Sequence, residues 1–435
     1  MPKHISVLAQ DRGEAGLAAA ENLPIREHVW KDPIFWFAIA LGLADGCVRN
    51  FVPTTFPIFS RDMGATLRQM GATQFLFYLS SLIFAVIGGT VLTIIGLRRS
   101  AMIALVLVGA SLILIGFAHA FIAVLVGSAL LGLAIVALVV IISSIVSGHF
   151  STRRQSVFLL SGLSDASGSM VGPAILGWWI VHSELWHLTW RSGYLAAAAV
   201  MGMLVVWAFF LPVERPGARL APANRRNSLG ATAEVLGNSA FYTAVVLCFC
   251  HGVAQAGMVS FIGQLYLRKL HIDAAHAAYL LSVEAIGILA GRLTFGAISS
   301  RWSIPELLLI ASCAAVETVA FLATILCKNY LAGAALFLAG GFFMSAIGPS
   351  LNSFLGGKLA SRAATAFALF AGLGNLGAAA GPYIIGILGS NFGIERGILF
   401  APLFSGLLSF IGFSRYLHER RFPRLLDPVI AEEGS

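Results

Sequence analysis

Charged side chains lie deep inside long apolar stretches of this chain. Asp45 and Arg49 stand four residues apart in ALGLADGCVRNF, so on a helix they share one face. Asp165, Glu284 and Arg292 lie in similarly apolar surroundings. A charge at bilayer depth costs about 2.5–3.5 kcal/mol on insertion scales, which makes each residue a candidate functional group. A carboxyl group can carry a proton, and an embedded arginine can hold an anion with its planar fork of donors.

Each of these residues has two interpretations at this stage. Asp45 could bind and release a proton while Arg49 binds an anionic substrate, or the two could form an i,i+4 ion pair that fixes the helix. Asp165 and Glu284 are the other candidate proton carriers. Alternatively, each could serve a structural role by forming hydrogen bonds at a gate. Arg292 either binds the substrate or contacts a loop near the end of its helix.

The stretches around these charges indicate the fold class. Of the 435 residues, 58% are hydrophobic and 11% are charged, whereas soluble domains carry about 25% charged residues. About 20 apolar residues form a helix that crosses a bilayer, and helices satisfy the backbone hydrogen bonds in lipid. The sequence therefore predicts an all-α polytopic membrane protein with twelve transmembrane helices, at residues 34–59, 70–96, 99–117, 120–147, 155–182, 190–212, 239–267, 274–299, 304–327, 330–355, 361–390 and 396–417.

The formal net charge of +8 reflects membrane topology. Lys and Arg concentrate in the tails and in alternate loops, for example at Arg153-Arg154, as the positive-inside rule requires of cytoplasmic segments. Both termini are therefore expected in the cytoplasm of a bacterium-like cell, with the chain in the inner membrane. The polar N-terminal residues are not expected to form a signal peptide. No nucleic-acid partner is expected.

A long polar stretch divides the predicted helices into six and six. The predicted organisation is a cytoplasmic tail at 1–33, a six-helix bundle at 34–212, a cytoplasmic linker at 213–238, a second bundle at 239–417 and a C-terminal tail at 418–435. Six-plus-six repeats of this kind occur in secondary transporters, whose substrate sites lie near the bilayer midplane between the halves.

One motif occurs once in each half. Residues 168–177 read GSMVGPAILG, and residues 377–386 read GAAAGPYIIG. Glycines four apart give a helix a smooth strip on which another backbone can lie, and the proline removes a hydrogen bond and bends the helix. We predict that these residues serve an interface that rocks: Gly168, Gly172, Pro173, Gly177, Gly377, Gly381, Pro382 and Gly386.

These features resemble the major facilitator superfamily across residues 34–417. The G-x-x-x-G-P stretch is similar to the family's antiporter motif, and a helix that opens with Trp190-Arg191 and closes with Pro212 follows a frequent family pattern. The turn GTVLTIIGLRR (89–99) resembles the family's loop signature, and GRLTFGAISSR (291–301) resembles its second copy. The resemblance implies gating roles for Gly89, Gly96, Arg98 and Arg99.

The chain departs from the loop signature at its acidic position. Thr93 stands where the family usually has Asp, and Ser300 stands at the equivalent position of the second copy. That Asp usually makes a charge contact between the halves on the cytoplasmic side. The inner gate of this chain is therefore expected to rely more on packing.

The resemblance also implies where each helix lies. Helices one, four, seven and ten would line a central cavity, helices two, five, eight and eleven would form the interface between the halves, and the others would support them from outside. Candidate polar contacts to the substrate in such a cavity are His251, Gln255, Asn352 and Asn375. Glu317 falls on a supporting helix and is expected to be structural.

Arg292 resembles the helix-eight arginine of monocarboxylate transporters and oxalate/formate antiporters, which contacts the substrate carboxylate. The acidic residue that monocarboxylate transporters place four positions earlier is Ile288 here, and the nearest acid is Glu284.

Cys248 and His251 are one helical turn apart and could join Asp45 and Cys47 in a soft transition-metal site. No dense ligand motif accompanies them, and a lone histidine more often forms hydrogen bonds to substrate or water. Transport of a metal or a metal chelate is the least favoured alternative, and no resident metal or cofactor is expected.

The sequence thus favours a monomeric secondary transporter that moves a small organic anion with proton coupling by alternating access. Arg49 and Arg292 would bind the anion, and Asp45, Asp165 or Glu284 would carry protons. The alternatives are proton-antiport efflux of amphipathic drugs or metabolites, in which Arg49 only neutralises Asp45, and a receptor that transports nothing. The sequence has neither a G-x-x-x-x-G-K-[ST] motif nor a catalytic constellation, which argues against ATP-driven transport and against an enzyme.

Overall fold

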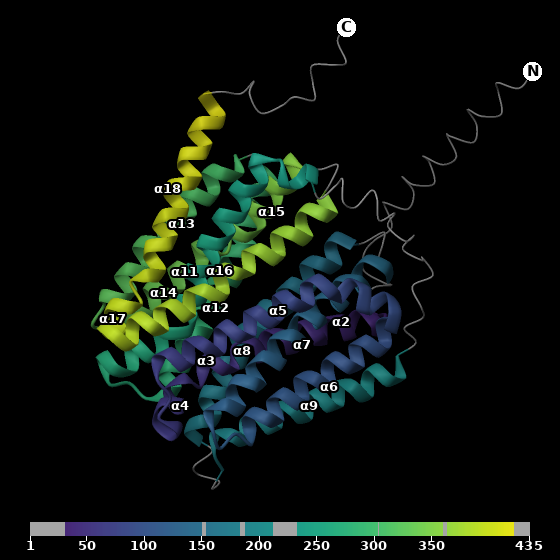
Figure 1. The fold of residues 1–435 in the computed structure, drawn as a ribbon, viewed down its shortest axis with the longest axis vertical. Helices are drawn as coiled ribbons and strands as arrows, with labels where there is room; N and C mark the ends of the chain where they lie inside the picture. The colour runs from purple at the N-terminus through teal and green to yellow at the C-terminus, as the bar shows by residue number, and fades with distance from the viewer. Residues whose placement is uncertain are drawn as a thin grey trace, which may run out of the picture.

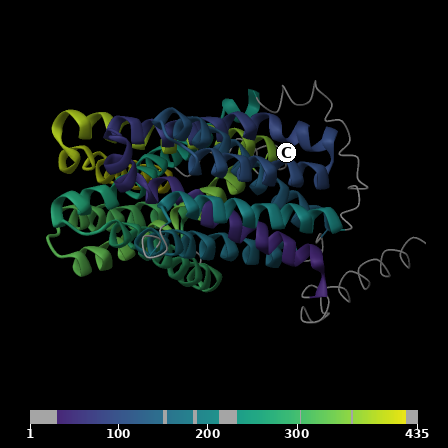
Figure 2. The same ribbon diagram turned by 90° about the horizontal axis from the view of Figure 1, so that it is seen from below.

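The computed structural model describes residues 31–149, 154–182, 188–211, 233–302, 304–359 and 363–421. Within these ranges the chain is almost wholly helical and contains no strand. The helices run roughly along one direction (Figures 1 and 2). Parts of the predicted tails and linker, at 1–30, 213–232 and 422–435, lie outside the described residues, as do Arg153 and Pro212.

The N-terminal half consists of α2 to α9. Their bounds are α2 (Pro33–Arg49), α3 (Phe51–Thr54), α4 (Phe56–Met63), α5 (Leu67–Ile95), α6 (Leu97–Gly116), α7 (Phe121–His149), α8 (Arg154–His182) and α9 (Trp190–Phe210). The side chains of 85–94, which include Thr93, are outside the described part of α5.

The C-terminal half consists of α11 to α18. Their bounds are α11 (Ser239–Leu270), α12 (Ala274–Arg301), α13 (Glu306–Leu326), α14 (Tyr330–Met344), α15 (Ile347–Lys358), α16 (Ala363–Phe392), α17 (Ile394–Gly397) and α18 (Phe400–Arg421).

All twelve predicted segments appear as helices or as runs of short helices. In the described ranges, nine helical stretches are long and apolar enough to cross a membrane. The first predicted segment is divided into α2, α3 and α4, where Pro53 and Pro57 lack the N–H that would continue the ladder of hydrogen bonds. The tenth is divided into α14 and α15, and the twelfth into α17 and α18.

The helices pack into two bundles that meet along two helix pairs. In the N-terminal bundle α2 packs on α8, α5 on α7, and α6 on both α7 and α9. In the C-terminal bundle α11 packs on α16, α14 on α12 and α13, and α13 on α18. The halves meet where α5 packs on α16 and α8 on α12, and α5 lies beside α16 in Figure 1.

The first two glycines of each repeated motif allow two helices of the same half to touch. A Cβ atom added to Gly168 or Gly172 would overlap the backbone of α2 at Leu43 and Cys47. In the other half, a Cβ on Gly377 or Gly381 would overlap the backbone of α11 at Phe249 and Val253. The two halves thus use the same device to bring their first and fifth helices together.

The third glycine of each motif faces the opposite half. A Cβ on Gly177 would lie 2.7 Å from the Cβ of Ala278 on α12, and one on Gly386 would lie 2.5 Å from the carbonyl oxygen of Leu67, which begins α5. Within the predicted interface set, Gly177 and Gly386 therefore lie between the halves, whereas Gly168, Gly172, Gly377 and Gly381 lie inside them. Both helices continue through Pro173 and Pro382.

The turn with the loop signature is ordered around Gly96. This residue joins α5 to α6 with a φ of 89°, a backbone conformation that residues other than glycine rarely adopt. The guanidinium of Arg98 lies 5.2 Å from the ring centroid of Phe209 on α9, in the same half. Arg99 is exposed, and Gly89 lies in α5.

Replacing Gly172 with Ala should destabilise the protein, because the new methyl group would overlap the backbone of Cys47. Overpacking costs about 1–3 kcal/mol, so we expect a clearly lower midpoint of thermal unfolding for the purified protein in detergent. Gly202→Ala is the matched control, since a Cβ there meets nothing within 4 Å. Equal unfolding midpoints for the two variants would contradict the close contact between α2 and α8.

Candidate functional site

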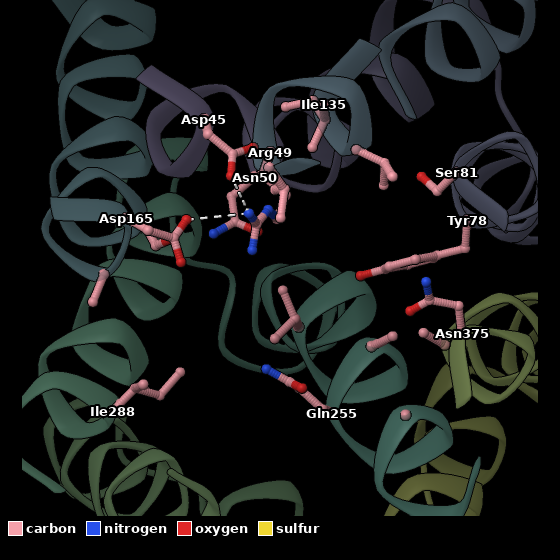
Figure 3. Close-up of a pocket in the computed structure, with 18 of the residues that line it drawn as sticks. Asp45, Arg49, Asn50, Tyr78, Ser81, Ile135, Asp165, Gln255, Ile288 and Asn375 are labelled. Carbon is pink, nitrogen blue, oxygen red and sulfur yellow. Dashed lines mark hydrogen bonds and ion pairs between the residues drawn. The ribbon is translucent and has the colours of Figure 1, made fainter. Parts of the chain in front are cut away.

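A cavity of about 620 Å³ lies between the two halves. The N-terminal half lines it with α2, α5, α7 and α8, and the C-terminal half with α11, α12 and α16 (Figure 3). Helix ten was expected to line the cavity, but α14 and α15 contribute none of its described lining residues. The reason is packing: Gly287 of α12 lies against the backbone of Leu338, so α14 sits behind α12.

The cavity extends from the middle of the bundle toward the end at which α2 and α11 begin. Its lining residues on α7 run from Ile135 to Ser143, in the second half of that helix, and those on α8 run from Ser161 to Ser169, in the first half. At the opposite end, near α4 and α17, the halves touch. There the rings of Phe56 and Phe261 lie 5.9 Å apart, and the N–H of Arg68 donates to Ser390 Oγ at 3.0 Å.

A charged trio occupies the N-terminal wall of the cavity. Arg49 forms an ion pair with Asp45 on its own helix and a second one, 3.1 Å long, with Asp165 on α8. Figure 3 shows the guanidinium between the two carboxyl groups. Asp45 is 1% exposed. A Cβ on Gly46 would overlap the backbone of Asp165, so the lack of a side chain there lets α8 come close enough for this ion pair.

The structure confirms the i,i+4 ion pair of Asp45 and Arg49 and places both residues at the cavity, and their roles as proton carrier and anion-binding group stay predictions. Because one guanidinium serves two carboxylates, Arg49 has no unmatched charge to offer an anion while both acids are ionised. An anion can bind it only if a carboxylate leaves or becomes neutral.

Arg292 lies at the mouth of the cavity, on α12. Its side chain is exposed, and Nη1 donates to the carbonyl oxygen of Gly162 on α8 at 3.4 Å. It is also close enough to Asp165 and Arg49 to interact with their charges. This position fits both a contact between the halves and the first binding of an anion that enters the cavity.

The C-terminal wall carries polar groups whose hydrogen-bonding capacity is not used by the described residues. His251 and Gln255 come from α11, Glu284 from α12 and Asn375 from α16. Among the described atoms, His251 Nδ1 and Glu284 Oε1 are buried and have no hydrogen-bond partner. In Figure 3, Gln255 points into the cavity and Asn375 lies beside Tyr78. Asn352 differs from the expectation, because it is exposed on α15 and does not line the cavity.

No metal centre is evident in the described part of the chain. Cys248, His251 and Asp45 all line the cavity, but no group of three His, Cys, Asp or Glu side chains there is close enough together to hold a metal ion.

Tyr78 is a lining residue that the sequence analysis missed. Its hydroxyl group points toward Arg49 in Figure 3, and the group interacts electrostatically with both Arg49 and Glu284. In the sequence it stands in QFLFYLSS, where an aromatic residue among apolar neighbours indicates packing. The following serines, of which Ser81 also lines the cavity, are a weak sign of a polar helix face.

The comparisons with known proteins agree with this architecture. The chain matches the Major Facilitator Superfamily over residues 35–382, which is most of its length. The chain belongs to this family, and the predicted fold of twelve helices in two six-helix halves is confirmed. No curated protein matches it in sequence, and the predicted likeness to the monocarboxylate and oxalate/formate branch stays a prediction.

Solved structures of transporters share this fold. A bacterial homolog of the human lysosomal transporter Spinster, in an inward-facing and unoccupied conformation, superposes with a TM-score of 0.71 at 14% identity, covering 89% of this chain and 97% of that one. The nucleoside transporter NupG superposes with a TM-score of 0.71 at 13% identity, covering 88% of this chain and 99% of that one. The protein is thus a transporter by family, and at these identities the likeness shows the fold alone.

Replacing Arg49 with Gln should destabilise the protein strongly, because it leaves two neighbouring carboxylates without their shared cation. Removing one partner from a buried ion pair costs about 3–5 kcal/mol. We therefore expect a large drop in the thermal unfolding midpoint at neutral pH. The triple variant Asp45→Asn, Arg49→Gln, Asp165→Asn removes all three charges and should recover most of the loss. If Arg49→Gln alone unfolds at the wild-type temperature, the trio does not hold α2 against α8.

Proposed function

We propose that this protein couples the movement of a small organic anion to the movement of protons, by alternating access in the inner membrane. Residues 34–212 would rock against 239–417 and expose the cavity to each side in turn. The observation that carries the proposal is the single guanidinium of Arg49, which two carboxylates share inside the cavity.

The trio couples a proton to an anion by charge balance. With Asp45 and Asp165 ionised, an incoming carboxylate would be a third negative group around one arginine. A proton on Asp165 neutralises that side chain and frees one side of the Arg49 fork, which the substrate carboxylate then occupies as a bidentate partner. The anion and the proton thus favour each other's binding, which is the thermodynamic requirement of symport.

The remaining lining residues have roles that follow from their positions. Arg292 at the mouth raises the local concentration of anions by electrostatic attraction. His251, Gln255 and Asn375 on the opposite wall offer hydrogen bonds to the polar part of the substrate. A substrate that touches both walls draws the halves together, and this contact favours the closure that alternating access requires.

The orientation of the cavity fits a cytoplasmic opening. Its open end is the end at which α2 begins and α18 ends, and the positive-inside rule predicts that both termini are cytoplasmic. The conformation would then be inward-facing, with the contacts near α4 and α17 closing the external side. A single chain contains the whole cavity, so the protein would function as a monomer.

A second candidate is proton-coupled efflux of amphipathic cations. Among the described lining residues, acids outnumber arginines: Asp45, Asp165 and Glu284 stand against Arg49 and Arg292. In this case a cation would displace the Arg49 side chain or a proton from Asp45, and Phe77 and Tyr78 would contact its apolar part.

Replacing Asp165 with Asn should uncouple anion uptake from the proton gradient. The variant frees one side of Arg49 permanently, so the anion binds without a proton. Anion uptake measured with a proton gradient should therefore fall to about the rate measured without a gradient. Proteoliposomes with an internal pH-sensitive dye, screened with labelled small carboxylates, measure both fluxes. Asp273→Asn at the start of α12, outside the cavity, is the control and should remain coupled.

The same vesicles separate the two candidate functions. Internal acidification in step with carboxylate uptake supports the symporter, and proton coupling that survives in Asp165→Asn would assign the proton to Asp45 or Glu284. If lipophilic cations drive proton movement and no carboxylate does, the anion proposal is wrong and the efflux candidate takes its place.

A further inference from the structure

One acid of the cavity lining has no cation to match it. Asp45 and Asp165 share Arg49 on the N-terminal wall, whereas Glu284 on α12 forms no ion pair in the described part of the chain. Glu284 is 4% exposed, and its Oε1 has no hydrogen-bond partner among the described residues. A buried carboxylate without a partner is strongly unfavourable, so an acid at this position needs either a proton or a cation that enters the cavity.

The contacts between α8 and α12 fix the depth of Glu284 in the bundle. The two helices run antiparallel, because a Cβ on Gly177 would lie 2.7 Å from the Cβ of Ala278, and at the other end Arg292 Nη1 donates to the carbonyl oxygen of Gly162 at 3.4 Å. Glu284 comes six residues after Ala278. It therefore lies level with the position that is six residues before Gly177 on α8.

The charged trio lies at the same depth on the opposite wall. The position of α8 level with Glu284 adjoins Gly172, which lies against the backbone of Cys47 on α2, and Cys47 stands between Asp45 and Arg49. Both α2 and α12 pack against α8, and the axes of touching helices are about 8–10 Å apart. The axes of α2 and α12 are then at most about 20 Å apart, and the side chains and the cavity fill the space between them.

A neutral hydrogen-bond acceptor lies level with Glu284 on the neighbouring helix. Residues 271–273 join α11 to α12, so these two helices also run antiparallel, and a Cβ on Gly263 would lie 3.2 Å from the carbonyl oxygen of Ala277. Counting seven residues from each of these positions brings Glu284 level with residue 256, next to Gln255. In Figure 3, Gln255 points into the cavity from the wall opposite Arg49. An ammonium group has three N–H donors, and both the carboxylate and the amide oxygen can accept from it.

We infer that the substrates of this cavity are small zwitterions, with a carboxylate at one end of a short chain and an ammonium group at the other. The carboxylate binds Arg49, and the ammonium group donates hydrogen bonds to Glu284 and Gln255 across the cavity. Because the two binding groups stand on opposite walls, an amino acid with its charges at opposite ends fits better than one with both on a single carbon. The inference deepens the proposed function and rests on it for the binding of the carboxylate to Arg49.

The charges of the described lining balance when a zwitterion is bound. With a proton on Asp165, as the proposed symport requires, the positive groups are Arg49, Arg292 and the ammonium group of the substrate. The negative groups are Asp45, Glu284 and the carboxylate of the substrate. A plain carboxylate leaves one negative charge in excess, in surroundings where an unmatched charge is costly. Glu284 thus selects a zwitterion over an anion of the same size.

Calorimetric titration of the purified full-length protein in detergent at neutral pH tests this inference. The probes are δ-aminovalerate, valerate and pentylamine, which share one chain length and differ only in their charged ends. Wild type should bind δ-aminovalerate about tenfold or more tightly than valerate, because the ammonium group adds charge-assisted hydrogen bonds. It should also bind δ-aminovalerate more tightly than pentylamine, which has no carboxylate for Arg49.

Variants of Glu284 assign the preference to this residue. Glu284→Gln should bind δ-aminovalerate and valerate with about equal affinity, because the charge that matches the ammonium group is gone. Glu284→Asp keeps the carboxylate and should retain part of the preference. Glu395→Gln on α17 is the matched control, since Glu395 is exposed and does not line the cavity, and this variant should keep the whole preference.

Each result decides the inference. Equal affinities of wild type for δ-aminovalerate and valerate overturn it and leave the anion proposal standing. A preference that survives in Glu284→Gln overturns it as well, and Glu284 is then a proton carrier or a structural acid. Pentylamine that binds as tightly as δ-aminovalerate favours the efflux candidate, and no binding of any probe contradicts both proposals. Calorimetry needs no proton gradient, so a preference that depends on Glu284 supports the inference even if the vesicle assay finds no proton coupling.

Discussion

The placement of Arg49 between two carboxylates is the constraint on which much of the N-terminal half depends. In a region of low dielectric an arginine without a matching acid, or an acid without a matching cation, is strongly unfavourable, so α8 has to lie close enough to α2 for Asp165 to reach Arg49. That distance is possible because Gly46, Gly168 and Gly172 leave no side chains between the two helices. The same ion pairs that hold the helices together place carboxyl groups in the cavity wall, so the proposed coupling would depend on the same atoms as the packing.

In both halves the first and fifth helices pack against each other through glycines, but the charged residues on these helices differ between the halves. Gly377 and Gly381 bring α16 onto α11 as Gly168 and Gly172 bring α8 onto α2. On α11, however, the cavity lining includes the polar residues His251 and Gln255 and no carboxylate or guanidinium. One half can then hold the charged part of a solute while the other supplies hydrogen bonds. The third glycine of each motif contacts the opposite half, so one motif sets both the packing within a half and the closure between halves.

Much of the fold was predictable from the sequence, because hydropathy determines where a helix can cross a bilayer and the repeated motif reveals two equivalent halves. The polar face of α2 was predictable for a related reason: Asp45 and Arg49 are too costly at that depth to lack a role. The second partner of Arg49 was not predictable, because the contact with Asp165 depends on how α2 and α8 are rotated, and hydropathy is nearly the same all around such helices. For the same reason, the sequence did not indicate that Tyr78 lines the cavity or that Asn352 lies outside it. A tyrosine in an aromatic run and an asparagine near a helix end give no indication of which way they face.

The distribution of charge also explains how two halves with buried ions can separate. The ion pairs of the cavity wall and of the C-terminal end of α15 each lie within one half: Arg49 with its two acids in the N-terminal half, and Lys358 with Glu419 in the C-terminal half. Between the halves the contacts are ring against ring at Phe56 and Phe261, glycine against backbone at Gly386, and single hydrogen bonds such as that from Arg292 to Gly162. Breaking a buried ion pair would cost several kcal/mol, whereas exchanging one hydrogen bond for another with water costs about 1 kcal/mol or less. The proposed rocking would therefore keep these ion pairs intact, and a change in protonation or a bound ion would alter the charge balance of the cavity wall, as the proposed coupling requires.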